Sequence, residues 1–230
     1  MLHTGLLVLI LNRYLGEVMK TTATWYFDII SPYAYLQSKQ LRSFSEQLNV
    51  SHVPVLFAGL LNHWGQLGPA EIEPKRQFIF RQAAWRAERL NITFRMPPSH
   101  PFNPLWALRL IAALGSTGQC TQTVFDHIWA EGHGLIEDAD KSLLAEKLGM
   151  TLKQANEASQ EPANKQAIIN NTTQAAANGV FGVPSFVVDE QIFWGDDSHD
   201  MLQDWLSGKL DFDSELMRSI DTTKPSATRR

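Results

Sequence analysis

Segments with the pattern of β-strands lie near the two ends of this chain, and the long stretch between them has the pattern of helices. An apolar strand over 24–30 precedes a helix over 32–48 and a second strand over 50–58, in which Pro54 favours an edge strand or a bulge. Residues 59–69 form a loop or a short, broken helix. Further helices are predicted over 75–90, 105–115, 119–131, 138–148, 151–159, 161–178 and 199–206, and further strands over 185–188 and 192–194. This order predicts one α/β domain interrupted by a helical insertion.

Ser31 stands where the first strand passes into the first helix, and the following Pro32 suits the first helical turn. The unpaired N–H groups and the dipole of a helix start favour negative charge, so a thiolate placed there would have a lowered pKa. From these residues alone, however, a serine before a proline indicates a helix cap rather than a catalytic group.

The 230 residues are 44% hydrophobic, which is enough for a sizeable core, and their net charge of −4 leaves no basic surface for nucleic acid. The single cysteine, Cys120, excludes an intrachain disulfide and a Cys-x-x-Cys pair. We interpret it as a structural thiol in a reducing compartment, which predicts a cytoplasmic protein.

The first residues carry a short apolar run, Gly5–Leu11, that is too short to span a bilayer and lacks the flanks of a signal peptide. Met19 leads directly into the first strand and resembles a natural start. We therefore interpret residues 1–18 as an upstream extension; an extra helix and a membrane-associating segment are the alternatives.

Three motifs occur in a fixed order: Phe27–Leu36 (FDIISPYAYL), Phe181–Phe186 (FGVPSF) and Trp194–Asp197 (WGDD). Together they resemble the DsbA-like branch of the thioredoxin fold and, more closely, 2-hydroxychromene-2-carboxylate isomerases and kappa-class glutathione transferases. The resemblance covers residues 22–210. It implies an α/β, thioredoxin-like fold with a large all-helical insertion, and a cis peptide bond between Val183 and Pro184.

The resemblance also divides the chain into parts. It implies an N-terminal extension outside the fold (1–22), a thioredoxin-like domain from two segments (23–60 and 179–210), a helical insertion domain (61–178) and a polar tail (211–230). The end of the tail is expected to be disordered because of its polar composition.

DsbA-like oxidoreductases carry cysteines where this chain has Ser31 and Ala34, so it cannot cycle through a disulfide of its own. In the isomerase and transferase branch, a serine at this point hydrogen-bonds the sulfur of bound glutathione. The resemblance therefore implies glutathione as cofactor, Ser31 as the catalytic residue that favours its thiolate, and isomerisation of an aromatic-catabolism intermediate of the 2-hydroxychromene-2-carboxylate type. The alternatives are a transferase that conjugates electrophiles and a non-catalytic thioredoxin-like protein that binds glutathione or a peptide.

The resemblance assigns the other glutathione contacts to Val183, Pro184, Trp194, Gly195, Asp196, Asp197 and Gln66. The backbone of Val183 would pair with the cysteinyl part, and Asp197 would accept from the glutamyl ammonium. Asp196 and Asp197 could also act as an N-cap pair. Gln66 stands where these families usually have an asparagine, and Asn62 and Leu67 stand where the isomerases tend to have a lysine and an arginine.

Substrate contacts are expected from Tyr33, Trp64, Trp85 and Asn103. Trp64, Trp85 and Phe102 line an apolar pocket or belong to the core.

His63, His100, His127 and His133 show no metal-ligand spacing, so no metal is predicted. Residues 131–134 (EGHG) form a surface turn or a loop that closes over the pocket. The expected partner is a small aromatic or electrophilic substrate, with no nucleic acid or membrane, and the resemblance implies a homodimer.

Overall fold

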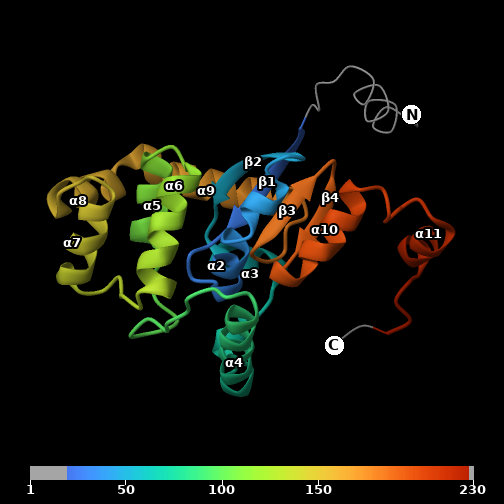
Figure 1. Cartoon of the computed structure of the whole chain (residues 1–230), viewed down its shortest axis with the longest axis horizontal. Helices are drawn as coiled ribbons and strands as arrows, with labels where there is room; N and C mark the ends of the chain where they lie inside the picture. Colours follow the sequence, from blue (N-terminus) through green and yellow to red (C-terminus); the bar gives the residue numbers. More distant parts are fainter. Residues whose placement is uncertain (1–19, 228–230) are drawn as a thin grey trace.

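The computed structural model describes residues 20–227, so the expected extension over 1–18 lies outside the described residues. Four strands form one sheet in the order β2-β1-β3-β4 (Figure 1). The strands are β1 (Thr21–Phe27), β2 (Leu48–Pro54), β3 (Ser185–Val188) and β4 (Gln191–Trp194). β1 is parallel to β2 and antiparallel to β3, which is antiparallel to β4. The α/β thioredoxin-like fold with a helical insertion is therefore confirmed.

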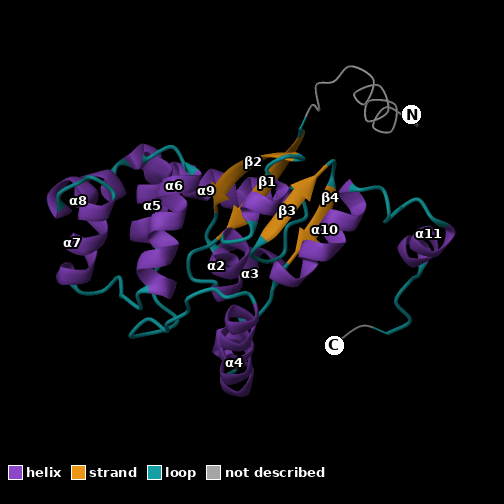
Figure 2. Ribbon diagram, in the orientation of Figure 1, coloured by secondary structure: helices purple, strands orange, loops and turns teal. Residues whose placement is uncertain are grey.

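Helices surround this central sheet (Figure 2). Those of the two chain ends are α2 (Pro32–Ser38), α3 (Phe57–Trp64), α10 (His199–Leu206) and α11 (Glu215–Thr222). Those between the strands are α4 (Glu73–Arg89), α5 (Leu105–Ala113), α6 (Gly118–Phe125), α7 (Asp138–Lys147), α8 (Leu152–Gln160) and α9 (Pro162–Ala177). A π-helix, η3 (Asp126–Ala130), continues α6, and the short 3₁₀ helices are η1 (Leu41–Phe44), η2 (Pro69–Glu71) and η4 (Asp196–Ser198). Within residues 20–227, no helix is long and apolar enough to cross a membrane.

Both faces of the sheet are buried. Successive side chains of β1 point to opposite faces, and they belong to two different core clusters. Trp25 and Phe27 belong to the larger core cluster, which also contains Tyr35 of α2 and Phe125 of α6. Tyr26 belongs to a second cluster with residues of α3 and α9. The sheet is therefore a central layer with helices on each side, and α4 projects beyond one end of it (Figure 1).

The first strand begins and ends earlier than expected, and the first helix and the second strand are shorter than expected. β1 covers 21–27 rather than 24–30, because Asp28 begins a turn in which Ser31 N–H donates to its carbonyl oxygen. Its start at Thr21 also corrects the expectation that residues 1–22 lie outside the fold, since Thr21 and Thr22 pair with β2. The helix expected over 32–48 ends at Ser38, and η1 follows it.

The second strand ends at Pro54, and Phe57 already begins α3, so the expected strand over 50–58 extended too far. Of the two alternatives for residues 59–69, a loop or a short, broken helix, the short helix is confirmed up to Trp64. Pro54 indicated an edge strand or a bulge, and β2 is an edge strand. The expected polar tail over 211–230 contains the helix α11, which Ser214 caps by accepting from Met217 N–H at 3.5 Å.

Candidate functional site

Three segments that are far apart in the sequence meet at one end of the sheet. Because Tyr26 at the end of β1 pairs with Ser185 at the start of β3, the segment after β1 lies beside the segment before β3. Ser185 also pairs with Trp194 at the end of β4, and Gly195 N–H donates to the Pro184 carbonyl at 2.8 Å. The three sequence motifs therefore converge at this end of the sheet.

Ser31 is the N-cap residue of α2, with Pro32 in the first turn. Its Oγ accepts a hydrogen bond from Ala34 N–H at 3.2 Å, and the residue is 8% exposed. Over residues 20–227, no acceptor takes the hydrogen of this hydroxyl. Ser31 is therefore a helix cap that still has a proton donor available for a ligand.

Three buried or half-buried side chains hold the backbone before Ser31. Trp129 of the π-helix donates from Nε1 to the Ile29 carbonyl at 2.8 Å, and His100 donates from Nε2 to the Ile30 carbonyl at 2.9 Å. Asp28 accepts from Ile30 N–H at 3.0 Å. These bonds fix the turn from which Ser31 projects.

Asp28 is a fully buried carboxyl group, and it also accepts from Phe57 N–H at 2.8 Å. Burial raises its pKa to about 7, although the two N–H groups oppose this effect. The N-cap residue of α3, Leu56, has no side chain that could cap the helix. Asp28 therefore serves as the cap of α3 from another part of the chain.

The peptide bond between Val183 and Pro184 is cis, as expected. Neither the N–H nor the carbonyl of Val183 has a hydrogen-bond partner within the described part of the chain. Next to it, Gly182 lies directly under the indole of Trp194, because a Cβ at Gly182 would lie 2.4 Å from Trp194 Nε1. This segment thus presents an unpaired backbone edge beside a half-exposed aromatic ring.

Gln37 of α2 connects the sheet to the third motif. Its side chain accepts from Trp25 Nε1 at 2.6 Å and donates to the Gly195 carbonyl at 2.9 Å. Gln37 is 1% exposed, so this buried amide links β1, α2 and Gly195.

Asp196 forms an ion pair with Arg86 of α4, whose Nε lies 2.7 Å from Asp196 Oδ2. The Asp196 side chain is 3% exposed, and its burial raises the pKa while Arg86 opposes the rise. Neither Asp196 nor Asp197 caps a helix through its side chain, so the N-cap prediction was wrong. Asp196 instead holds α4 against the third motif, whereas Asp197 is exposed.

Tyr33 also contacts α4, since its hydroxyl donates to Gln82 Oε1 at 2.7 Å. Burial, together with the charge of Asp196, raises the pKa of Tyr33 to about 12. Tyr33 and Arg86 thus fix α4 over the end of the sheet that carries Ser31.

The other residues predicted to contact ligands are more scattered. Trp85 is 53% exposed and has the Arg89 guanidinium over its ring, and Asn103 is exposed and accepts from Leu105 N–H. Trp64 donates from Nε1 to the Val180 carbonyl, and the neighbouring Gln66 is exposed.

Trp64, Trp85 and Phe102 were expected either to line an apolar pocket or to belong to the core. Phe102 belongs to the core cluster, whereas Trp64 and Trp85 are 43% and 53% exposed. No ring contact joins these three residues in the described chain. A cavity of about 490 Å³ lies instead between α3, α5 and α9. Its walls are largely apolar, with Arg109 and Lys165 as the charged residues that line it.

Five residues that support the site were not predicted to do so from the sequence: Asp28, Gln37, Arg86, His100 and Trp129. An acidic residue inside an apolar run marks Asp28 as unusual, and His100 lies in a proline-dense segment that excludes a helix. The other three had no local signal, because their partners lie far away in the sequence.

The relatives of this chain among known proteins include isomerases and a glutathione transferase. The 2-hydroxychromene-2-carboxylate isomerase of Sphingobium xenophagum is 29% identical over 196 residues, which cover 82% of this chain and 99% of that protein. Glutathione S-transferase kappa 1 of Rattus norvegicus is 26% identical over 183 residues, which cover 70% of this chain and 78% of that protein.

A solved structure of a 2-hydroxychromene-2-carboxylate isomerase has the same fold, with a TM-score of 0.72 at 19% identity, over 88% of this chain and 100% of that one. The family model described as DSBA-like thioredoxin domain matches residues 22–207, which include all three motifs and the helices between them. The chain belongs to the DsbA-like thioredoxin-domain family.

Proposed function

We propose that this protein is a glutathione-dependent isomerase that acts on an aromatic-catabolism intermediate of the 2-hydroxychromene-2-carboxylate type. The observation that carries the proposal is the available hydroxyl hydrogen of Ser31 at the start of α2. The isomerases and the kappa-class transferase among its relatives support an enzyme of this class.

Ser31 would donate its hydroxyl hydrogen to the sulfur of bound glutathione. Ala34 N–H already donates to the Ser31 oxygen, which polarises the hydroxyl and fixes its direction. The first N–H groups of α2 add partial positive charge at the same place. Both effects stabilise the charged form of a thiol and lower its pKa.

An ionised Asp28 would oppose such a negative charge, because its carboxyl group lies close to Ser31 and accepts from the N–H of the preceding residue, Ile30. Burial raises its pKa to about 7. Below that pH the site can therefore accept a thiolate at Ser31 with less repulsion from Asp28 than an ionised carboxylate would cause.

The unpaired N–H and carbonyl of Val183 fit the cysteinyl backbone of glutathione, which would add as a short strand edge next to Pro184. Because Arg86 already neutralises Asp196, the exposed Asp197 is the carboxylate left for the glutamyl ammonium. Trp194 and Gly195 would form the wall beside it, and Gln66 would supply an amide from the end of α3.

Glutathione would supply a sulfur nucleophile that adds to an electrophilic carbon and later leaves, which splits one difficult step into easier ones. The residues of the chain bind and orient both molecules and hold the proton at Ser31. Tyr33, Trp64, Trp85 and Asn103 stay candidates for the substrate side. The single cysteine and the use of a free thiol fit a reducing compartment such as the cytoplasm, and the resemblance implies a homodimer.

A kappa-class-like transferase is the second candidate. It is favoured by the residues around Gln66, where Asn62 and Leu67 replace the basic residues that the isomerases tend to carry for the substrate carboxylate. A conjugating enzyme needs no such charges. The non-catalytic alternative, a protein that binds glutathione or a peptide, predicts binding without turnover.

Glutathione-dependent turnover should be measured with 2-hydroxychromene-2-carboxylate and a panel of conjugation electrophiles. Ser31→Gly retains most of the helix-capping energy but has no hydroxyl, so we expect kcat to fall by about 10²-fold or more with little change in stability. Ser214→Ala is the matched control, since it removes the serine cap of α11. Unchanged turnover in Ser31→Gly would refute the catalytic role.

A further inference from the structure

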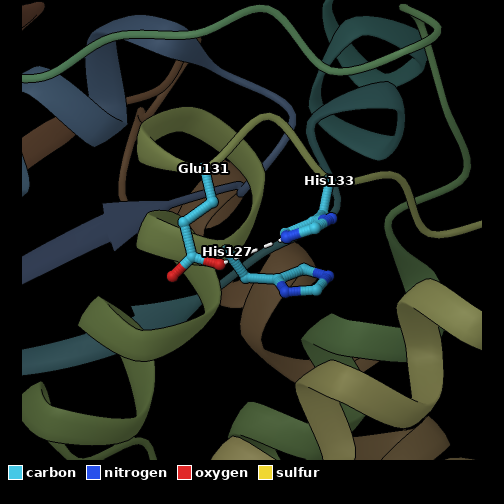
Figure 3. A group of neighbouring side chains, drawn as sticks. All are labelled: His127, Glu131 and His133. Carbon is cyan, nitrogen blue, oxygen red and sulfur yellow. Dashed lines mark ion pairs between the residues drawn. The ribbon is translucent and has the colours of Figure 1, made fainter.

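Two histidines and a glutamate come together where the π-helix η3 passes into the following loop (Figure 3). His127 lies in the π-helix, and Glu131 and His133 follow it. One ligand atom from each of the three residues lies within 4.8 Å of the other two. π-Helices are rare and often occur at functional sites.

His127 is completely buried, yet neither ring nitrogen has a hydrogen-bond partner within residues 20–227. Buried polar groups in native proteins almost always have a partner, so this side chain requires an explanation. A neutral imidazole has a lone pair on one ring nitrogen, and in His127 no side chain of the described residues uses it.

The His133 ring stacks on the His127 ring with 4.7 Å between the centroids, and carboxylates contact both of its nitrogens. Its Nε2 lies 3.4 Å from Glu131 Oε2, and its Nδ1 lies 3.2 Å from Asp140 Oδ1. Asp140 is itself fixed, because its Oδ2 accepts from Gly134 N–H at 3.0 Å. A carboxylate on the far nitrogen of a histidine is the usual second partner in zinc sites.

We propose that His127, Glu131 and His133 bind one zinc ion, with one coordination position left for water. Two imidazoles and a carboxylate are ligands that Zn²⁺ accepts, and three protein ligands leave a tetrahedral site open. Zn–N distances of about 2.0–2.1 Å require the three ligand atoms to move closer together. Glu131 and His133 can make this movement, because their side chains are 42% and 35% exposed.

Lys147 occupies part of this site as a competitor, since its ammonium group forms an ion pair with Glu131 Oε2. Its side chain is 33% exposed, so it can turn into solvent when a doubly charged ion replaces it. Zinc binding should thus be limited by Lys147 and should improve when this charge is removed.

The zinc ion would connect the loop after the π-helix to the segment that supports Ser31. His127 is two residues from Trp129, whose indole donates to the Ile29 carbonyl. The proposal does not depend on glutathione chemistry, because its ligands and its test are separate from Ser31.

The test is a titration of the full chain, stripped of metal by a chelator, with Zn²⁺ in competition with a chromophoric zinc indicator. We expect about one equivalent to bind, and we expect Glu131→Gln and His133→Gln each to weaken the affinity by at least about tenfold. Lys147→Met should strengthen it, an effect that a misfolded variant could not produce. His63→Gln, which removes an exposed histidine on α3, should leave the affinity unchanged.

Equal affinity in wild type, Glu131→Gln and His133→Gln would overturn the proposal, as would the absence of a bound equivalent. A loss of affinity in His63→Gln would also overturn it, because the ion would then bind elsewhere. Weaker binding in the two ligand variants together with tighter binding in Lys147→Met would establish the site.

Discussion

Replacing Asp28 with asparagine should remove most of the pH dependence of stability that this buried carboxyl group causes. Its pKa is about 7 in the folded protein and 3.8 in a model peptide. Because the folded pKa is raised, the folded state binds more protons than the unfolded state between these values. The contribution of Asp28 to the free energy of unfolding is therefore fully present below about pH 4 and is lost as the pH rises to about 7.

The size of the effect follows from the same two values. The interval from 3.8 to about 7, at about 1.4 kcal/mol per pH unit, gives about 4 kcal/mol in total. Between pH 5 and pH 8 the loss should be about 3 kcal/mol, because part of the titration lies below pH 5. The amide introduced by Asp28→Asn cannot titrate, although it can accept only one of the two N–H bonds made to Ile30 and Phe57. This second effect costs about 1–3 kcal/mol at every pH and does not change the slope.

The assay is urea unfolding of wild type and Asp28→Asn at pH 5 and pH 8. The wild type should lose about 3 kcal/mol more than the variant between the two conditions. Asp138→Asn is the control, because its side chain is 82% exposed and should leave the slope unchanged. If the free energy of unfolding fell equally in wild type and Asp28→Asn between pH 5 and pH 8, the reasoning would be refuted, since other groups would then cause the pH dependence.

Two further substitutions test the contacts around the third motif. Arg86→Met leaves the buried Asp196 without its partner, so the free energy of unfolding should fall by about 2–3 kcal/mol. This loss is smaller than for a fully buried ion pair, because the Arg86 side chain is 25% exposed. Lys153→Met, which breaks an exposed pair, should cost less than about 0.5 kcal/mol. Gly182→Ala places a methyl group 2.4 Å from Trp194 Nε1, so the indole ring must move. Glutathione should then bind about fivefold more weakly, which calorimetry can measure.

Each of these results has an outcome that would contradict the structure. Similar losses for Arg86→Met and Lys153→Met would mean that the Asp196 pair is not buried in solution. For Gly182→Ala, the matched control is Gly118→Ala, where the nearest neighbouring atom lies at 3.4 Å. Equal glutathione affinity in the two alanine variants would show that Trp194 does not contribute to binding.

Local sequence patterns were sufficient for most of the architecture. The insertion helices α5 to α9 and the β3–β4 hairpin follow from apolar periodicity and from the turn between the strands, and both were predicted within a few residues. The family motifs added the thioredoxin-like fold and the cis peptide bond between Val183 and Pro184. These features depend on residues that are close together in the sequence, which is why they were accessible without a structure.

The missed features depend on contacts over long sequence separations. α3 was partly interpreted as a strand because its cap is Asp28, which is 29 residues from Phe57. A helix cap was one of the two roles considered for Asp196, and its ion pair was not foreseen because its partner, Arg86, is 110 residues away. In both cases the local pattern did not contain the tertiary partner that decides the structure.

The histidine cluster was missed for a different reason. His127 and Glu131 precede His133 with a spacing that crosses the end of a π-helix, so the 3.6-residue period of an α-helix does not describe it. For Trp64, Trp85 and Phe102 the sequence left a pocket and the core as alternatives, because aromatic residues alone do not reveal whether they face the core or the solvent.

The most direct test of the central claim is the ultraviolet absorbance of the glutathione thiolate bound to the protein, titrated with pH. In the wild type the sulfur should ionise at least about one pH unit below the value near 8.5 of a free thiol. In Ser31→Gly the midpoint should return toward that value while the Kd for glutathione changes only a few-fold. Identical titration curves for the two proteins would contradict the claim that the Ser31 hydroxyl stabilises the thiolate.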